Sequence, residues 1–163
     1  TLNQLEFGND QLSMERFDLV ELIRGVIQPS QILVEQKNAK IIFNQSAPVY
    51  VWGDEFKIEE VVTNYLTNAL NHLGGDNVIE ITCKDDNGIV VTTVFNTGKP
   101  IPEEGMEKIW VKFYKVDKAR TREYGGSGIG LSIVKAIMDA HQQKCGVKNY
   151  KNGVAFSFTL ESK

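Results

Sequence analysis

The chain has 163 residues, of which 42% are hydrophobic and 24% charged, and its formal net charge is −3. This composition is typical of a single globular domain with a real core, and it gives no overall basic signal for nucleic-acid binding. No apolar run approaches the roughly 20 residues of a membrane span, and two distant cysteines indicate reduced thiols rather than a disulfide framework or a zinc site.

The N-terminal segment predicts the end of a helix followed by an edge strand. Leu2 and Leu5 stand at helical spacing before Gly8, which ends the pattern. Residues 11–17 alternate loosely between apolar and polar types, as a half-buried strand does. The start at Thr1 rather than at a methionine suggests a piece of a longer protein.

The first complete helix is predicted to begin after Asp18. Asp18 is a suitable N-cap, and Glu21 three residues later completes a capping box. Pro29 should kink or break the helix, which resumes over 32–34. The apolar face of this helix consists of Leu19, Leu22, Ile23, Val26 and Ile27.

Two predicted strands, 39–43 and 49–52, lead to a second helix over about 55–73. Asp54 is its predicted N-cap, and two glycines end it. Its apolar face consists of Ile58, Val61, Val62, Tyr65, Leu66, Ala69, Leu70 and Leu73.

The second half of the chain reads as hairpins interrupted by two helical segments. Strands 78–83 and 89–95 flank an Asp-Asp-Asn-Gly turn, which is a strong hairpin signal. A short helix over 103–113 follows Pro102. After a glycine-rich run, a helix ends near His141, and two further strands, 146–149 and 154–160, close the chain. This order predicts an α+β fold, a two-layer sandwich with a mixed sheet of about five strands packed on three helices.

The glycine-rich run 124–131 leads directly into the last helix. Glycines allow close approach of the backbone to a ligand, and a helix N-terminus presents unpaired N–H groups that suit phosphate. The simpler alternative is a flexible loop before a core helix. The run is not a dinucleotide fingerprint, because a charged segment rather than a strand precedes it, and it lacks the Gly-Lys-Ser/Thr of a Walker A loop.

Two asparagines on the second helix are candidate metal ligands. Asn64 and Asn68 stand four residues apart and therefore share a helix face. Their amide oxygens are hard ligands of the kind that Mg²⁺ accepts alongside phosphate oxygens. The alternative is a pair of solvated side chains on the outside of a helix.

Two further stretches carry candidate chemistry. The turn 96–102 follows a strand, and Asn96 beside Gly98 can read the edge of a base, although an ordinary connection would look similar. Residues 112–126 hold five cations and two anions, a local charge of +3. This basic run is either a lid that closes over a polyphosphate or a solvated loop.

Together these motifs resemble those of a known family. N-x-x-x-N-A at 64–69, T-G-x-P-I-P at 97–102, F-Y-K-V-D-K-A-R at 113–120 and G-G-S-G-I-G-L at 125–131 resemble the N, G1, F and G2 boxes of the sensor histidine kinase catalytic domain. That domain belongs to the wider gyrase, Hsp90, histidine kinase and MutL ATPase family. The resemblance covers about residues 18–160, and it identifies 1–8 as the end of a dimerisation helix and 9–163 as the catalytic ATP-binding domain.

The resemblance implies roles for individual residues. Asn68 would be the principal Mg²⁺ ligand with Asn64 as a helper, and Asn96 would read adenine. Lys115 would be the catalytic contact to phosphate, where the family usually has arginine, and Phe113 would anchor a lid. The implied nucleotide-binding positions are Asn64, Asn68, Asn71, His72, Asn96, Gly98, Ile101, Phe113, Lys115, Gly126, Ser127, Gly128, Ile129, Gly130 and Leu131.

Three positions depart from the family pattern. The G1 box usually begins with aspartate, but here it begins with Asn96. Asn71 and His72 replace a lysine and an aromatic residue, and His72 either stacks near the nucleotide or lies on the surface. A carboxamide that rotates by half a turn can serve adenine or guanine, so the margin of ATP over GTP is predicted to be smaller than with Asp by roughly 1–2 kcal/mol.

The implied function is transfer of the γ-phosphoryl group of ATP to a histidine on the protein's own dimerisation domain, in a homodimer, and then to an aspartate of a response regulator. Neither His72 nor His141 lies in an acceptor motif, so this chain alone should bind ATP and be inactive. The resemblance also implies a cytoplasmic domain of a bacterial inner-membrane sensor, joined to the membrane only through missing upstream segments. The alternative is a conformational ATPase module of the gyrase and Hsp90 branch, where a glutamate base stands four residues before the metal-binding asparagine; here that residue is Asn64.

Overall fold

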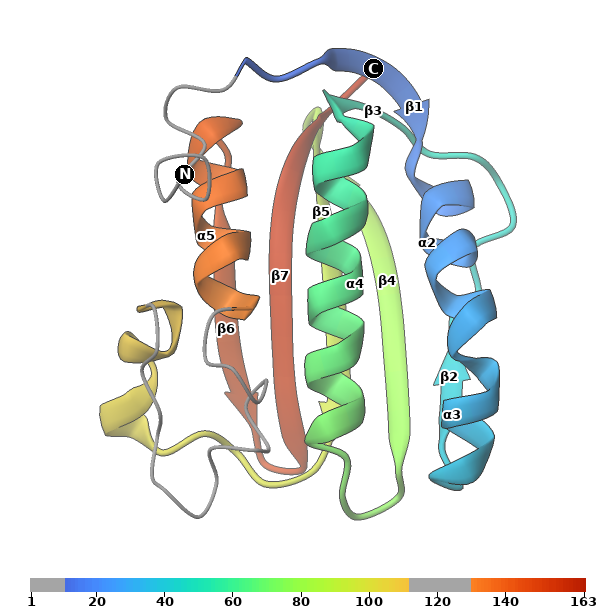
Figure 1. Ribbon diagram of the computed structural model, residues 1–163, viewed down its shortest axis with the longest axis vertical. Helices are drawn as coiled ribbons and strands as arrows, with labels where there is room; N and C mark the ends of the chain where they lie inside the picture. Colours follow the sequence, from blue (N-terminus) through green and yellow to red (C-terminus); the bar gives the residue numbers. More distant parts are fainter. Residues whose placement is uncertain (1–10, 112–129) are drawn as a thin grey trace.

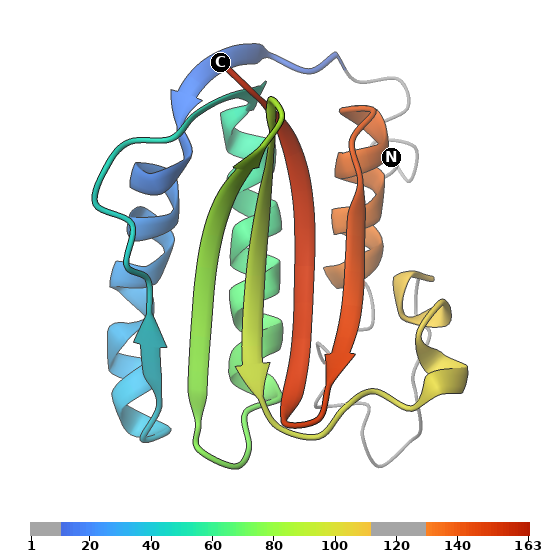
Figure 2. The same cartoon turned by 180° about the vertical axis from the view of Figure 1, so that it is seen from behind.

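A computed structural model of the chain describes residues 11–111 and 130–163. The predicted helix end at 1–8 and the predicted lid within 112–129 lie outside these residues. The described chain forms two layers, with the helices on one face of a single sheet and no described helix on the other face (Figures 1 and 2). The predicted α+β sandwich is confirmed.

In the described residues seven strands form the sheet, one at each of the seven strand segments that the sequence predicts and two more than the five or so expected of the fold class. Their order is β1-β3-β7-β5-β4-β2. The strand β6 pairs with β7 on the same edge as β3: β3 pairs with the last residues of β7, and β6 pairs with the residues before them. Only β2 and β4 pair in parallel among the described strands, so the sheet is mixed. The strands are β1 (Met14–Asp18), β2 (Lys40–Ile42), β3 (Tyr50–Asp54), β4 (Val78–Asp86), β5 (Ile89–Thr97), β6 (Cys145–Tyr150) and β7 (Gly153–Ser162).

The helices begin where the sequence predicts. Asp18 caps the first helix by accepting from the backbone N–H of Val20, and Asp54 caps the second by accepting from that of Lys57. A turn of 3₁₀ helix containing Pro29 interrupts the first helix, as expected from the missing proline N–H. The helices are α2 (Leu19–Ile27), α3 (Gln31–Gln36), α4 (Glu55–Asn71) and α5 (Gly130–Ala140).

The predicted helix over 103–113 is wrong for residues 103–111, the part that the structure describes. Two short 3₁₀ turns, η2 (Glu103–Gly105) and η3 (Lys108–Trp110), occupy this stretch. Gly105 is a poor helix former, and the ring of Trp110 packs edge-on against Phe156, with ring centroids 5.8 Å apart. The tertiary contact therefore decides the local conformation.

The core lies between α4 and the central strands. Tyr65 is fully buried on α4, and its hydroxyl donates to the carbonyl of Ser157 on β7 over 2.8 Å. Burial raises the pKa of Tyr65 well above its ordinary value, so this phenol remains a donor. The ring also packs against Phe156 and Phe158 at centroid distances of 5.4 and 6.1 Å. These contacts fix the rotation of α4 about its axis and with it the direction of its polar side chains.

A buried histidine joins the N-terminus of α4 to the C-terminus of α5. His141 is 7% exposed. Its Nδ1 lies 2.9 Å from the carbonyl oxygen of Ile137, and its Nε2 accepts the backbone N–H of Asp54 over 3.0 Å. Both bonds are satisfied only by the neutral ring protonated at Nδ1. The sequence predicts His141 only as the end of a helix. The structure shows that its ring connects α5 to the N-cap of α4 through these two hydrogen bonds.

Candidate functional site

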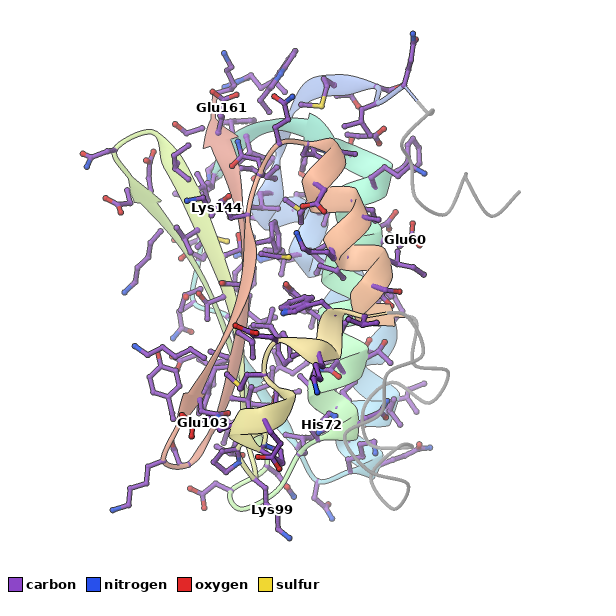
Figure 3. The ribbon with its side chains drawn as sticks, turned by 90° about the vertical axis from the view of Figure 1, so that its left-hand side faces the viewer. Glu60, His72, Lys99, Glu103, Lys144 and Glu161 are labelled. Atoms are coloured by element: carbon purple, nitrogen blue, oxygen red, sulfur yellow. The ribbon has the colours of Figure 1, made fainter. Side chains whose placement is uncertain are left out.

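The candidate site lies where the second half of α4, the end of β5 and the start of α5 meet. α4 and α5 run in opposite directions over the same face of the sheet, so the C-terminal part of α4 is near the first turn of α5 (Figure 1). His72, Lys99 and Glu103 gather at this end of the molecule, whereas Glu60 lies farther along the helix (Figure 3). The fold therefore brings together three segments that are distant in the sequence.

Asn68 has an unusual environment. Its side chain is only 4% exposed, yet neither carboxamide atom has a hydrogen-bond partner among the described residues. Buried polar atoms in native proteins are almost always paired, and leaving one unpaired costs about 1–3 kcal/mol. An unpaired buried amide of this kind fits a position that a ligand or metal completes.

Asn64 points from the same helix toward the beginning of α5. Its Nδ2 donates to the carbonyl of Glu60 over 3.0 Å. Its Oδ1 would lie 3.1 Å from a Cβ atom built on Gly130, the first residue of α5. The oxygen of Asn64 and the N-terminus of α5 thus border the same space, and a side chain at position 130 would intrude on it.

These two amides can hold Mg²⁺ together with phosphate oxygens. A hard cation accepts neutral amide oxygen, and Mg²⁺ commonly takes few protein ligands and leaves the other positions to phosphate and water. Residues 11–111 and 130–163 contain no cluster of three or more His, Cys, Asp or Glu side chains suited to a metal. The donor set therefore fits a cation that arrives with a polyphosphate better than a resident metal ion.

Asn96 stands at the end of β5 with its side chain 1% exposed. Its Nδ2 donates to the carbonyl oxygen of Thr97 over 3.1 Å and to that of His72 over 3.4 Å. Its Oδ1 has no partner among the described residues. The two carbonyls hold the amide in one orientation and leave the oxygen as an acceptor for a ligand.

This orientation changes the expectation for base selectivity. Rotation by half a turn would bring Oδ1 against two carbonyl oxygens and lose both hydrogen bonds. Asn96 therefore offers only its oxygen, as an aspartate would. Such an acceptor suits the 6-amino group of adenine and opposes the 6-oxo group of guanine.

The turn after Asn96 packs closely on the end of α4. Gly98 has φ of +149°, and a Cβ atom there would lie 2.4 Å from the carbonyl oxygen of His72. The Gly74 N–H donates to the Thr97 carbonyl over 3.0 Å, and the Gly98 N–H donates to the Asn152 carbonyl over 3.0 Å. Only glycine fits at position 98, and the turn is bonded on both sides.

The remaining predicted site residues differ in exposure, and some lie outside the described residues. Asn71 is exposed at the end of α4, and His72 is half-buried as its C-cap. Ile101 and Leu131 are buried in the core, at 2% and 9% exposure. The predicted positions Phe113, Lys115, Gly126, Ser127, Gly128 and Ile129 lie outside the described residues.

Sequence reasoning missed Asn149 of β6. Its Oδ1 accepts the Ile101 N–H over 2.9 Å, and its Nδ2 donates to the Ile101 carbonyl over 2.8 Å. The available signal was the Pro-Ile-Pro run at 100–102, because its single N–H requires an acceptor from elsewhere. Nothing in the sequence names that acceptor.

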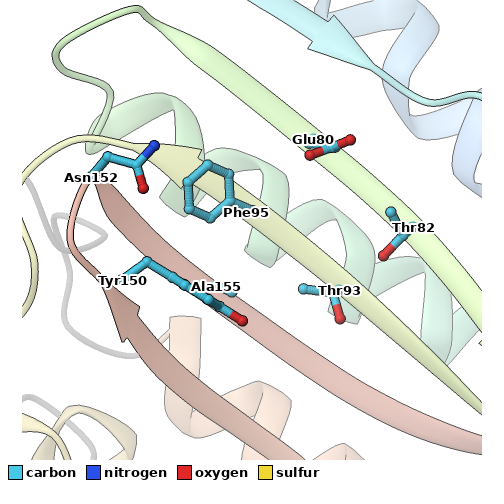
Figure 4. Close-up of a pocket in the computed structure, with 7 residues that line it drawn as sticks. All are labelled: Glu80, Thr82, Thr93, Phe95, Tyr150, Asn152 and Ala155. Atoms are coloured by element: carbon cyan, nitrogen blue, oxygen red, sulfur yellow. The ribbon is translucent and has the colours of Figure 1, made fainter.

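A hollow lies on the face of the sheet that carries no described helix (Figure 4). It has a volume of about 260 Å³, and Glu80, Phe95 and Tyr150 are among its lining residues. Phe95 and Asn96 are successive strand residues and point to opposite faces. This hollow is therefore not part of the candidate site.

A family model described as "Histidine kinase-, DNA gyrase B-, and HSP90-like ATPase" matches residues 53–163. The chain belongs to this family. It is similar to the catalytic domain of the histidine kinase ThkA, with 33% identity, a TM-score of 0.80, and 92% of this chain and 96% of that domain covered. The family and the fold thus agree with the resemblance seen in the motifs.

Two sensor histidine kinases are among the relatives of this chain. WalK of Bacillus subtilis is 30% identical, and the match covers 99% of this chain and 27% of WalK. CusS of Escherichia coli K12 is 32% identical, and the match covers 93% of this chain and 32% of CusS. This chain therefore spans about a third or less of these relatives. ThkA has also been solved in complex with the response regulator protein TrrA; that structure has a TM-score of 0.79 and 31% identity, with 99% of this chain and 46% of that chain covered. No helix of the described ranges is both long and apolar enough to cross a bilayer.

Proposed function

We propose that this domain binds ATP with Mg²⁺ and donates the γ-phosphoryl group to a histidine on its own dimerisation domain, for relay to a response-regulator aspartate. Family membership supports ATP binding and a kinase role in two-component signalling. In this proposal the complete protein is a homodimer, and the chain described here is the part that binds the nucleotide.

The observation that carries the proposal is the unpaired carboxamide of Asn68. The Asn68 carboxamide is buried without a hydrogen-bond partner among the described residues, and Asn64, one helical turn earlier on the same face of α4, borders the start of α5. The free energy lost by leaving it unpaired is recovered when it binds a cation that carries a polyphosphate. Bound Mg²⁺ would neutralise phosphate charge during transfer.

The protein's own residues position the nucleotide from two ends. Asn96 holds the base through its oxygen, and Asn68 with Asn64 holds the metal–phosphate end. Lys115 and the glycine-rich run complete the phosphate site in this proposal. Catalysis then consists of orientation and charge stabilisation, since phosphoryl transfer requires little covalent chemistry from the protein.

The accepting histidine is supplied by another segment. Of the two histidines in the chain, His141 is buried with both ring nitrogens hydrogen-bonded. A phosphoacceptor needs an accessible nitrogen with a lone pair that can attack. His141 is thus a structural residue. Because His72 does not lie in an acceptor motif either, we expect that the isolated chain does not phosphorylate itself.

Hydrolysis as in the gyrase and Hsp90 branch is the competing function. That reaction needs a general base beside the attacking water, and Asn64 occupies the corresponding place. A carboxamide does not accept a proton from water at neutral pH, and its Nδ2 already bonds to the helix backbone. The chemistry of position 64 therefore favours transfer to histidine.

Titration calorimetry with ATP tests the proposal, first with Mg²⁺ and then with excess chelator. We expect binding that weakens at least tenfold without the metal. With γ-labelled ATP, the chain alone should stay unlabelled, and it should transfer label to an added dimerisation domain that carries a histidine. Absence of ATP binding, or stable labelling of His72 or His141, would refute the proposal, and rapid phosphate release without an acceptor would favour the hydrolytic alternative.

A further inference from the structure

The backbone that leaves the Asn96 turn has very few hydrogen-bond donors. Pro100 and Pro102 have no N–H, so Ile101 carries the only backbone donor of residues 100–102. This segment cannot extend the sheet, because a strand needs regular donors for its ladder. Its position must be fixed in another way.

Asn149 provides the fixing contact. Its carboxamide makes two hydrogen bonds to one residue, accepting from the Ile101 N–H over 2.9 Å and donating to the Ile101 carbonyl over 2.8 Å. This pattern imitates the pairing of a strand residue with its neighbour. Asn149 lies on β6, which pairs only with β7 among the described strands, and its side chain bonds to the turn segment across from this strand.

The β6–β7 hairpin bonds to the same turn a second time. The carbonyl of Asn152 accepts the Gly98 N–H over 3.0 Å. Between them, Asn149 and Asn152 bond to the chain at Gly98 and Ile101, immediately after Asn96. The Ile101 side chain, at 2% exposure, is buried in the core at the same point.

We propose that Asn149 is a positioning residue for nucleotide binding: it holds Ile101, and through it the 96–101 turn, in the geometry that presents the Asn96 oxygen to the base. The proposal rests on the function proposed above. Asn149 itself does not touch the nucleotide or any reacting atom. Its effect should therefore fall on the base and leave the phosphate end unchanged.

Asn149→Leu tests this, because leucine has nearly the same size and makes neither hydrogen bond. The first measurement is hydrogen exchange of the Ile101 backbone N–H, which is the only exchangeable backbone amide of residues 100–102 because its neighbours are prolines. We expect its exchange to accelerate at least tenfold in the variant. This measurement needs no ligand, and it reports on the bond whether or not the chain binds ATP.

The second measurement compares the affinity for Mg²⁺–ATP with that for Mg²⁺–tripolyphosphate, which has no base. We expect ATP binding to weaken about tenfold, the scale of two lost hydrogen bonds, and tripolyphosphate binding to change less than twofold. Asn149→Asp keeps an acceptor for the Ile101 N–H but replaces the second hydrogen bond by repulsion between two oxygens, so it too should lose ATP affinity and keep tripolyphosphate affinity. If leucine prevents folding, the aspartate variant alone decides the question through the same pair of affinities.

Gln143→Ala is the matched control, because it removes a side-chain bond to Thr159 at the other end of the hairpin. It should leave both affinities and the Ile101 exchange unchanged. Equal loss of ATP and tripolyphosphate affinity in Asn149→Leu would indicate general damage and overturn the proposal. So would an unchanged ATP affinity in a variant whose Ile101 amide exchanges faster. Failure of the wild-type chain to bind ATP would instead overturn the proposed function, and the positioning role with it.

Discussion

Replacing Asn96 by aspartate would restore the residue that the family usually has, and we expect it to damage this protein. The new carboxylate oxygen would replace Nδ2 at 3.1 Å from the Thr97 carbonyl oxygen and 3.4 Å from that of His72. Two hydrogen bonds become two repulsive contacts, at a position with 1% exposure.

The magnitude follows from these contacts. Two lost hydrogen bonds cost about 1–2 kcal/mol together, and a buried charge without a partner costs about 3 kcal/mol or more. Asn96→Asp should therefore lower the free energy of unfolding by roughly 4 kcal/mol or more at neutral pH, the sum of the two costs. Asn96→Ala, which loses the bonds without adding charge, should lower it by only about 1–2 kcal/mol.

Urea unfolding followed by tryptophan fluorescence measures both variants, with a lower midpoint expected for aspartate than for alanine. The aspartate deficit should shrink as the pH falls, because a protonated carboxyl regains a donor for the Thr97 carbonyl. Competition binding adds a second test, in which wild-type protein should prefer ATP to GTP by tenfold or more and Asn96→Asp should not widen that preference. An aspartate variant as stable as wild type, or one with a wider ATP preference, would refute the fixed orientation of the Asn96 amide.

The remaining predictions concern the metal site, the buried histidine and the tight turn. Asn68→Ala should weaken Mg²⁺-dependent ATP binding at least tenfold and Asn64→Ala much less, as calorimetry would show; equal affinities of wild type and Asn68→Ala would exclude the metal assignment. Burial lowers the pKa of His141 below its ordinary value of 6.5, with its hydrogen bond to the Ile137 carbonyl offsetting part of the shift. The unfolded chain therefore takes up the proton first, so the stabilisation is complete above about pH 6.5 and is lost as the pH falls below it; thermal unfolding at pH 7.5 and 5.5 should show this loss, and His141→Gln should reduce the dependence. Gly98→Ala should cost about 1–3 kcal/mol, because its φ of +149° and the contact at 2.4 Å exclude a side chain. Gly25→Ala, in open space on α2, should instead stabilise by about 0.5–1 kcal/mol, and similar effects of the two substitutions would contradict the strain at Gly98.

Local signals were sufficient for the elements that depend on nearby residues. The caps Asp18 and Asp54, the break at Pro29 and the β4–β5 hairpin were all predicted, because each depends on hydrogen bonds or steric limits within a few residues. The motif order also predicted the family that the comparisons confirm. All seven strand segments were located as well, but their order in the sheet was not, since strands that pair can lie far apart in the sequence.

Contacts between distant segments decided the rest. Residues 103–110 form two 3₁₀ turns rather than a helix, and Trp110 packs against Phe156 of β7. The buried state of Asn68 and the fixed amide of Asn96 likewise arise only when α4, β5 and the turn after it come together.

The sequence by itself therefore determined which residue types carry the chemistry and in what order they stand. It could not determine their orientation, because Asn96 is held by a carbonyl 24 residues earlier in the chain and Ile101 by an amide 48 residues later. A side chain's rotamer depends on the groups that surround it in space, and those groups are assembled only by the packing of α4 on the sheet. Whether an asparagine acts as an acceptor, a metal ligand or a clamp for the backbone is thus a property of the tertiary structure.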